Sequence, residues 1–396
     1  MTDKKKKTVI EKPNAFLYTL FYLIIAPFLK FKCNTKYDKS GLKDLKGPAL
    51  VLCPHTSNID FLLVACTLFP IRPTFVVSEH FMAKPKIRWI LNKMHVISKK
   101  MFCPDIKTIM NIIRAKDSGN VIVLFPEGRL PAHGHSVQVT EGTADLIKKL
   151  GVNVYILTEN GAYKTLPKWG KCGIRKGKML VTTSKLYDGS EIADLTVPQI
   201  QKDLDMVILH DEDKIFEDIE FKCDKPALGL DGVLYKCPHC KSEFTMTSND
   251  HFIKCSCGFS SELDCKYNLN GGPFKKINDW YFWQEEEINL DEPLESETIL
   301  AVPDPETGYL NRNAGSGIIR MDKEKIYFKG KCFDEDLEFT EKNEVIKALP
   351  LSVGDHFDLY HKKKMYNFIL QPDPRAVMKW SMYLDKVTKE NTKNLE

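Results

Sequence analysis

A histidine and an aspartate five positions apart, His55 and Asp60, are the first residues of this chain whose types and spacing could do chemistry. An apolar run at 49–53 precedes the histidine and indicates a buried strand, and the run 61–66 indicates a buried helix. His55 is therefore expected just beyond the carboxyl end of a strand, where open α/β sheets place their reactive groups. A carboxylate in the same loop can orient the imidazole of a general base. The alternative is a solvated loop histidine.

A second strand end carries polar groups about seventy residues later. The buried run 121–125 is followed by Pro126, Glu127, Gly128 and Arg129. The glycine lets the backbone approach a ligand closely. Two such strand ends can converge on one crevice that holds His55, Asp60, Glu127 and Arg129. A surface turn with a solvated glutamate and arginine is the other interpretation.

These two motifs resemble those of the glycerolipid acyltransferase family, in the branch that acylates 1-acylglycerol-3-phosphate. That family carries a His, four residues and an Asp, and later a Phe-Pro-Glu-Gly motif, which this chain has at His55–Asp60 and Phe125–Gly128. The resemblance covers roughly residues 15–190. It implies that His55 is the general base and Asp60 its orienter. The acceptor and its phosphate would be bound by the following residues: Glu127, Gly128, Arg129, Lys99 and Lys100, the two lysines standing where the family has an arginine.

The resemblance also implies an activity. A fatty acyl group would pass from a thioester, acyl-CoA or acyl carrier protein, to the hydroxyl of a lysophospholipid. The expected acceptor is 1-acylglycerol-3-phosphate, which gives phosphatidic acid in phospholipid biosynthesis. Two alternatives stay open: an acyltransferase for another lysolipid or for glycerol-3-phosphate, and a non-catalytic scaffold on a lipid surface.

Strand-like and helix-like segments alternate from residue 47 to about 190, which predicts an α/β fold with a mostly parallel sheet flanked by helices. Residues 71–116 of this region carry ten Lys or Arg against two acids, which suits an anionic substrate or lipid headgroups unless it is simply a solvated face. The predicted strands are 49–53, 74–78, 95–98, 121–125, 152–157 and 179–183, and the predicted helices are 60–69, 85–93, 105–117 and 141–150.

The amino-terminal segment is basic and apolar. Residues 1–46 carry eleven Lys against four acids, and residues 15–29 are apolar and aromatic. Fifteen residues fall short of the roughly 20 that cross a bilayer, so an interfacial helix is expected. The alternative is a helix packed on a soluble core. Because no cleavable signal follows, we expect a peripheral or monotopic protein on the cytoplasmic face of the cell membrane, with membrane lipids as partners.

Four of the twelve cysteines form a tight cluster with the pattern Cys-x2-Cys, fourteen residues, Cys-x-Cys. Four thiolates on two knuckles suit tetrahedral Zn²⁺, and a site without an open position is structural. Few basic residues surround the cluster, so no nucleic acid partner is expected. The other thiols singled out (Cys53, Cys66, Cys103 and Cys172) are expected to be packing residues. The predicted zinc ligands are Cys237, Cys240, Cys255 and Cys257, with Cys265, His239 and His251 as competing candidates. The alternative is four cysteines that are unligated or paired in disulfides.

Composition shifts predict five regions. The carboxyl-terminal one has short strand-like stretches followed by an amphipathic helix at 374–390, a pattern typical of a small PH-like β domain. The predicted order is a membrane-associating segment (1–46), an acyltransferase domain (47–225), a zinc ribbon (226–270), an acidic linker (271–295) and the β-rich PH-like domain (296–396).

Overall fold

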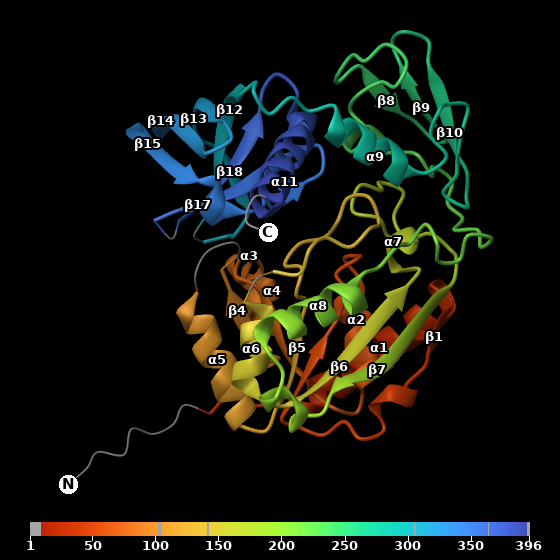
Figure 1. Cartoon of the computed structure of the whole chain (residues 1–396), viewed down its shortest axis with the longest axis vertical. Coiled ribbons are helices and arrows are strands. Elements are labelled where there is room, and N and C mark those ends of the chain that lie inside the picture. The colour runs from red at the N-terminus through yellow and green to blue at the C-terminus, as the bar shows by residue number, and fades with distance from the viewer. Residues whose placement is uncertain (1–8, 101–104, 141, 305, 363, 394–396) are drawn as a thin grey trace. The chain divides into compact units, whose positions relative to one another are not determined.

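The computed structural model describes residues 9–100, 105–140, 142–304, 306–362 and 364–393 (Figure 1). These residues divide into two compact units. The first contains the described residues up to Leu166 and Lys176–Phe216. The second contains Pro167–Arg175 and the chain from Glu217 onward. The chain therefore leaves the first unit after Leu166, returns at Lys176 and leaves it again after Phe216.

The first unit is built on a seven-stranded sheet in the order β1-β7-β6-β2-β5-β3-β4. The run β6-β2-β5-β3-β4 is parallel throughout, and β7 is antiparallel to β6. The predicted mostly parallel sheet is confirmed. The strands are β1 (Thr35–Tyr37), β2 (Ala49–Leu52), β3 (Thr74–Ser78), β4 (Ile97–Lys99), β5 (Val121–Leu124), β6 (Asn153–Asn160) and β7 (Met179–Tyr187).

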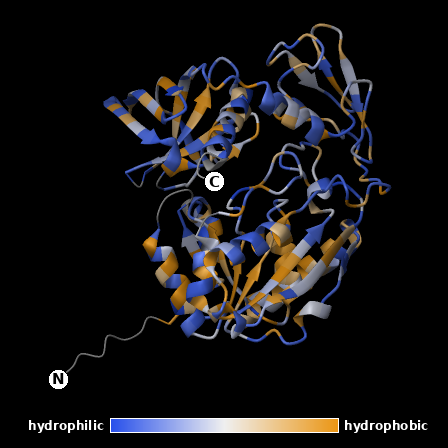
Figure 2. Cartoon of the chain, viewed as in Figure 1, coloured by the Kyte–Doolittle hydropathy of each residue, from blue (hydrophilic) through white to orange (hydrophobic). Residues whose placement is uncertain are grey.

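The centre of this sheet is buried on both faces. Every residue of β2 and β5 is buried, which explains why both strands are continuous apolar runs with no polar alternation. Figure 2 shows the same concentration of hydrophobic residues along these strands. Prediction missed the short β1 and placed the β4 strand two residues too early, at 95 and not at Ile97. His95 has a positive φ of 48°, so it cannot belong to a strand.

Helices cover both faces of the sheet. Crossovers through α2 and through α3–α4 move across the sheet in one direction, and those through α5 and α6 move in the other. Since such crossovers are right-handed, α2 and α3–α4 share one face while α5 and α6 share the opposite face. α1 packs on α2, and α8 packs on α6. The helices are α1 (Ala15–Lys32), α2 (Asp60–Leu68), α3 (His80–Ala83), α4 (Pro85–Lys93), α5 (Ile106–Asp117), α6 (Thr143–Leu150), α7 (Ala162–Thr165) and α8 (Val197–Ile208), with 3-10 turns at Ser40–Leu42 and Glu191–Ala193.

The amino-terminal helix is longer than its apolar run. α1 has 18 residues, and by length and composition it is able to cross a membrane. It is anchored to the first unit near both of its ends. The backbone N–H of Asn14 donates to the Lys93 carbonyl (3.3 Å), the Tyr18 hydroxyl donates to the Ala65 carbonyl (2.8 Å), and Leu29 is buried. The helix therefore lies along the surface of this unit.

The second unit contains two antiparallel sheets. The small one has the order β11-β10-β9-β8 and carries the cysteine cluster. The larger one has the order β15-β14-β13-β12-β18-β17-β16 and is followed by the helix α11, so the β-rich carboxyl-terminal part is present. Its likeness to a PH domain stays a prediction. The strands are β8 (Met246–Ser248), β9 (Phe252–Cys255), β10 (Ser260–Leu263), β11 (Leu269–Asn270), β12 (Leu294–Pro303), β13 (Leu310–Met321), β14 (Lys325–Cys332), β15 (Glu335–Lys342), β16 (Leu351–Ser352), β17 (His356–His361) and β18 (Lys364–Leu370).

The segment expected to be an acidic linker, 271–295, is a packed element and not a linker. It contains the helix α9 (Ile277–Glu286), whose Trp280 and Gln284 are buried. The Gln284 side chain accepts from the Tyr235 N–H (3.1 Å) and donates to the Val233 carbonyl (2.7 Å). The remaining helices of this unit are α10 (Asn343–Ile346) and α11 (Val377–Lys393), with 3-10 turns at Leu230–Gly232 and Pro374–Ala376.

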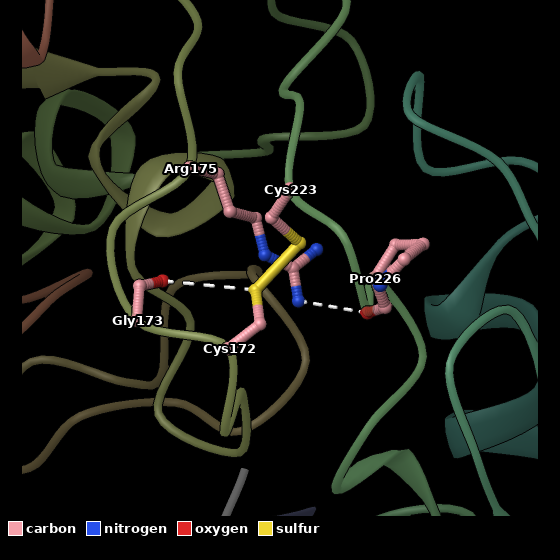
Figure 3. Close-up of a disulfide and its surroundings, with 5 residues drawn as sticks. All are labelled: Cys172, Gly173, Arg175, Cys223 and Pro226. Carbon is pink, nitrogen blue, oxygen red and sulfur yellow. Dashed lines mark hydrogen bonds between the residues drawn. A yellow bond between two sulfur atoms is a disulfide. The ribbon is translucent and has the colours of Figure 1, made fainter.

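One disulfide corrects a prediction. Cys172, expected to be a simple packing residue, is bonded to Cys223, 51 positions later (Figure 3). The bond ties the excursion Pro167–Arg175 to the chain that enters the second unit after Phe216. Beside it lies the buried Arg175, whose guanidinium is 4.9 Å from the rings of both Trp169 and Tyr267. Cys53 and Cys66 are buried as expected, and Cys103 lies outside the described residues.

Candidate active site and cysteine cluster

The loop between β2 and α2 holds the histidine and the aspartate in direct contact. His55 lies three residues beyond the end of β2, and Asp60 begins α2. Nδ1 of His55 is 3.0 Å from Oδ2 of Asp60. The same oxygen accepts the backbone N–H groups of Thr56 (2.7 Å) and Ser57 (2.8 Å). The carboxylate is therefore fixed by the loop that carries the imidazole, and the N-terminus of α2 favours its negative charge.

This contact determines which imidazole nitrogen is available for chemistry. Asp60 is fully buried, and its carboxylate can only accept, so Nδ1 of His55 carries the proton. Nε2 then keeps its lone pair. The His55 side chain is 27% exposed, so this open nitrogen can meet a substrate. The ring also lies against Phe125, with centroids 4.6 Å apart.

Glu127 reaches the same place because β2 and β5 are parallel and in register. Leu52 pairs with Leu124, and His55 and Glu127 each lie three residues beyond those partners. Glu127 is only 2% exposed, and its Oε2 accepts the backbone N–H of His55. Its Oε1 accepts the N–H of Val137 at 3.1 Å. Burial raises the pKa of this carboxyl to about 8, although the two backbone hydrogen bonds oppose the shift.

The other predicted site residues lie at the same edge of the sheet. Gly128 has a φ of 71°, a conformation that favours glycine. Arg129 follows it and is partly buried. Lys99 ends β4, which is separated from β2 by β5 and β3, so it lies about 14 Å across the sheet from the histidine strand. Lys100 follows, with its Nζ 3.8 Å from Oε2 of Glu79. Acceptor and phosphate binding by these residues stays a prediction.

Sequence reasoning missed a third buried carboxyl, Glu159 on β6. In the register that pairs Leu52 with Ile156, Glu159 lies at the level of His55 on the neighbouring strand. It is fully buried, and among the described residues neither carboxyl oxygen has a hydrogen-bond partner outside its own residue. Burial, and then the charge of Asp60, raise the pKa of Glu159 well above its usual value. An acid inside an apolar strand was the signal that could have found it.

The four clustered cysteines bring their sulfur atoms together. All four Sγ atoms lie within 4.8 Å of one another. Sγ of Cys237 is 3.8 Å from that of Cys257, and Sγ of Cys240 is 3.7 Å from that of Cys255. These distances are too long for disulfides, in which the two sulfurs are about 2.05 Å apart. Four thiolates about 2.3 Å from a tetrahedral zinc would lie about 3.8 Å apart, so the cluster fits zinc.

The backbone of the cluster also suits a metal knuckle. The N–H of Lys241 donates to the Cys237 carbonyl (3.0 Å), and the N–H of Gly258 donates to the Cys255 carbonyl (3.0 Å). Gly258 has a φ of 94°, which a side chain would strain. Cys237 and Cys255 are buried while Cys240 and Cys257 are exposed, so the site lies at the surface of the second unit.

Part of the first unit matches a known protein family. Residues 34–158 match the family model described as Acyltransferase, a span that contains His55, Asp60 and Glu127. Among solved structures, the chain is similar to the 1-acyl-sn-glycerophosphate (LPA) acyltransferase, PlsC, from Thermotoga maritima. That likeness has 14% sequence identity and a TM-score of 0.42, and it covers 49% of this chain and 78% of that chain.

Proposed function

We propose that this chain transfers a fatty acyl group from a thioester to a lysophospholipid hydroxyl, a proposal supported by the match of residues 34–158 to the family model described as Acyltransferase. The proposed acceptor is 1-acylglycerol-3-phosphate, and the product is phosphatidic acid. The donor is acyl-CoA or an acylated acyl carrier protein. The observation that carries the proposal is the 3.0 Å contact between His55 Nδ1 and Asp60 Oδ2, which leaves Nε2 free as a base.

The chemistry follows from that tautomer. Nε2 of His55 takes the proton of the acceptor hydroxyl as its oxygen attacks the thioester carbonyl carbon. A C–O bond forms, the C–S bond breaks, and the departing thiolate receives the proton from the imidazolium. Asp60 stabilises that imidazolium while it exists. An alcohol is a weak nucleophile at neutral pH, so a positioned base is what the reaction needs.

Glu127 has a positioning role in this proposal. It accepts a hydrogen bond from the His55 backbone N–H and another from Val137, so it links the histidine loop to the loop after β5. Both carboxyl oxygens are used in these contacts. The proposal assigns the acceptor phosphate to the cations at this edge of the sheet, Arg129 after β5 and Lys99 and Lys100 at the end of β4, while Gly128 allows close approach of the backbone.

The cysteine cluster contributes structure to this function. Zn²⁺ held by Cys237, Cys240, Cys255 and Cys257 stabilises the small sheet of the second unit. Four protein ligands leave no open coordination position, so the ion takes no part in acyl transfer. No nucleic acid enters this proposal.

Membrane attachment is assigned to α1. Its 18 residues are apolar enough to enter a bilayer, and only 11% of them are buried. Because the helix is anchored near both of its ends to the first unit, we propose a monotopic arrangement in which it lies in the interface of the cytoplasmic leaflet.

An acceptor panel tests the activity. Purified full-length protein is incubated with labelled acyl-CoA, or with acylated acyl carrier protein, and with 1-acylglycerol-3-phosphate, other lysolipids or glycerol-3-phosphate. We expect phosphatidic acid as the main product, and a loss of about 10²–10⁴-fold in rate for His55→Ala. A preference for another acceptor would favour the alternative, an acyltransferase for another lysolipid or for glycerol-3-phosphate. Acylation of no acceptor would favour the non-catalytic lipid-surface scaffold, and an unchanged rate for His55→Ala would overturn the assignment of His55 as the base.

A further inference from the structure

The segment from His80 to Lys93, which contains α3 and α4, is unusually exposed. No residue of α4 is buried, although the helix has nine residues. Trp89 is 59% exposed and Ile90 is 54% exposed. In α3, Phe81 is 47% exposed. A surface helix normally buries an apolar stripe against its own core, and α4 presents its largest apolar side chains to solvent. We call residues 80–93 the docking segment.

The charge of this region has one sign. Residues 80–104 contain six Lys or Arg and no Asp or Glu. Four of these cations belong to the docking segment, and among the described residues no carboxylate pairs with any of them. A large exposed aromatic group among unpaired cations matches the chemistry of an anionic lipid surface, where headgroups attract the cations and Trp lies at the interface. The four cations are Lys84, Lys86, Arg88 and Lys93.

The docking segment lies on the same face of the sheet as α1. Right-handed crossovers put α2 and α3–α4 on one face, and α1 packs on α2. The N–H of Asn14, which begins α1, donates to the carbonyl of Lys93, which ends α4. α1 also exposes an apolar stripe at helical spacing on its outer side. The exposed residues of that stripe are Phe16, Leu20, Leu23, Ile24, Phe28 and Phe31.

The segment also borders the proposed active site. α3 begins just beyond β3, at the carboxyl edge of the sheet where His55 and Glu127 also lie. Phe61, the neighbour of Asp60 in α2, is half exposed. Exposed apolar side chains therefore occur on α1, on α3 and α4, and in α2 beside the loop that carries the base.

We propose that the docking segment binds an anionic bilayer surface, with Lys84, Lys86, Arg88 and Lys93 on the headgroups and Trp89 and Ile90 in the interface. Together with α1 it presents the His55 edge of the sheet to the membrane. A lysophospholipid acceptor then reaches the base without leaving the lipid surface. Only this last step rests on the proposed function; the docking itself does not.

Vesicle binding of the full-length protein tests the charges. Partitioning is measured on vesicles of phosphatidylcholine alone and of phosphatidylcholine mixed with phosphatidylglycerol. We expect the double variant Lys86→Gln and Arg88→Gln to bind the anionic vesicles about tenfold or more weakly, with little change on the neutral ones. The matched control is Lys202→Gln, an exposed lysine of α8, whose partner helix α6 covers the opposite face. Equal losses for the variant and the control would overturn the proposal.

If α1 alone holds the protein on vesicles, the charge variant will not lose binding. Quenching of tryptophan fluorescence by brominated lipids then tests directly whether the docking segment meets the bilayer. The chain has five Trp, so the Trp89→Phe variant isolates one of them. We expect brominated vesicles to quench the wild type more than this variant. The same quenching in both proteins would show that Trp89 does not enter the bilayer and would overturn the proposal. Acyl transfer to a water-soluble short-chain acceptor separates the two proposals, since it should survive in the α4 variants and be lost in His55→Ala.

Discussion

The site around His55 and the cysteine cluster are built in opposite ways. The His55 site joins residues 72 positions apart, and its carboxyl groups are buried in an apolar sheet. The cluster joins residues within one short stretch, and two of its four thiols are exposed. The geometry of the His55 site therefore depends on the whole sheet, whereas we expect the cluster to depend on the zinc ion that we propose it binds. Perturbing each in turn should affect different properties of the molecule.

Removing the metal should have the largest effect and should be confined to the second unit. Chelation, or the Cys255→Ser variant, is expected to remove about 10 kcal/mol of apparent folding free energy from that unit. The unfolding transition of the first unit should stay in place. Calorimetry follows both transitions, and elemental analysis measures zinc, for which one ion per chain is expected. Cys332→Ser, a partly exposed thiol of the same unit that lies outside the cluster, is the control. If the zinc-free protein showed the same calorimetric unfolding transitions as the zinc-bound protein, the cluster would have no structural role.

Breaking the dyad should affect rate and leave folding nearly intact. The Asp60→Asn variant loses the charge that orients His55 and stabilises the imidazolium, so we expect a loss of about 10³-fold in kcat. Zinc content should not change. Asp194→Asn, an exposed aspartate of the same unit, serves as the matched control. A rate within a few-fold of wild type would contradict the assignment of Asp60.

The buried carboxyl Glu127 should make stability depend on pH. Its pKa is raised by burial from 4.5 to about 8, so its contribution is fully present below about pH 4.5 and is lost as pH rises through about 8. Stability of the first unit should therefore fall by a few kcal/mol across this range. Urea unfolding at several pH values measures the slope, which Glu127→Gln should reduce. Because Glu159 shifts in the same direction, the slope should not vanish. If the free energy of unfolding depended on pH equally in Glu127→Gln and in the wild type, another group would be the cause of that dependence.

Replacing Glu159 should have the smallest effect on the rate. Burial and the charge of Asp60 raise its pKa, so the folded protein favours the neutral carboxyl, which Glu159→Gln mimics. We expect a change in rate of only a few-fold at pH 7, together with a gain in stability that grows as the pH rises above about 4.5, because the native acid then ionises more readily in the unfolded chain than beside Asp60. Activity and urea unfolding at pH 7 and 9 check both statements. A large loss of activity at pH 7 would show that the proton on Glu159 is used.

Much of the first unit could be predicted from local pattern. The central strands of the sheet are continuous apolar runs, and Gly151 ends α6 in the left-handed conformation expected of a helix stop. Prediction failed where a local pattern was weak or misleading. The three-residue β1 has too little sequence to show a period. In α9, Trp280 and Tyr281 are buried although seven acids lie nearby at 281–300.

The sequence by itself determined the histidine and aspartate loop, the cluster of four thiols and the α/β alternation, because each depends on residues close together in the chain. Only the tertiary structure decided that Glu127 holds the His55 backbone and that Glu159, near the dyad, has no hydrogen-bond partner outside its own residue in the described part of the chain. It also decided that Cys172 meets Cys223 and that α4 buries nothing. These facts depend on strand order, register and burial, which arise only when segments far apart in the chain pack together.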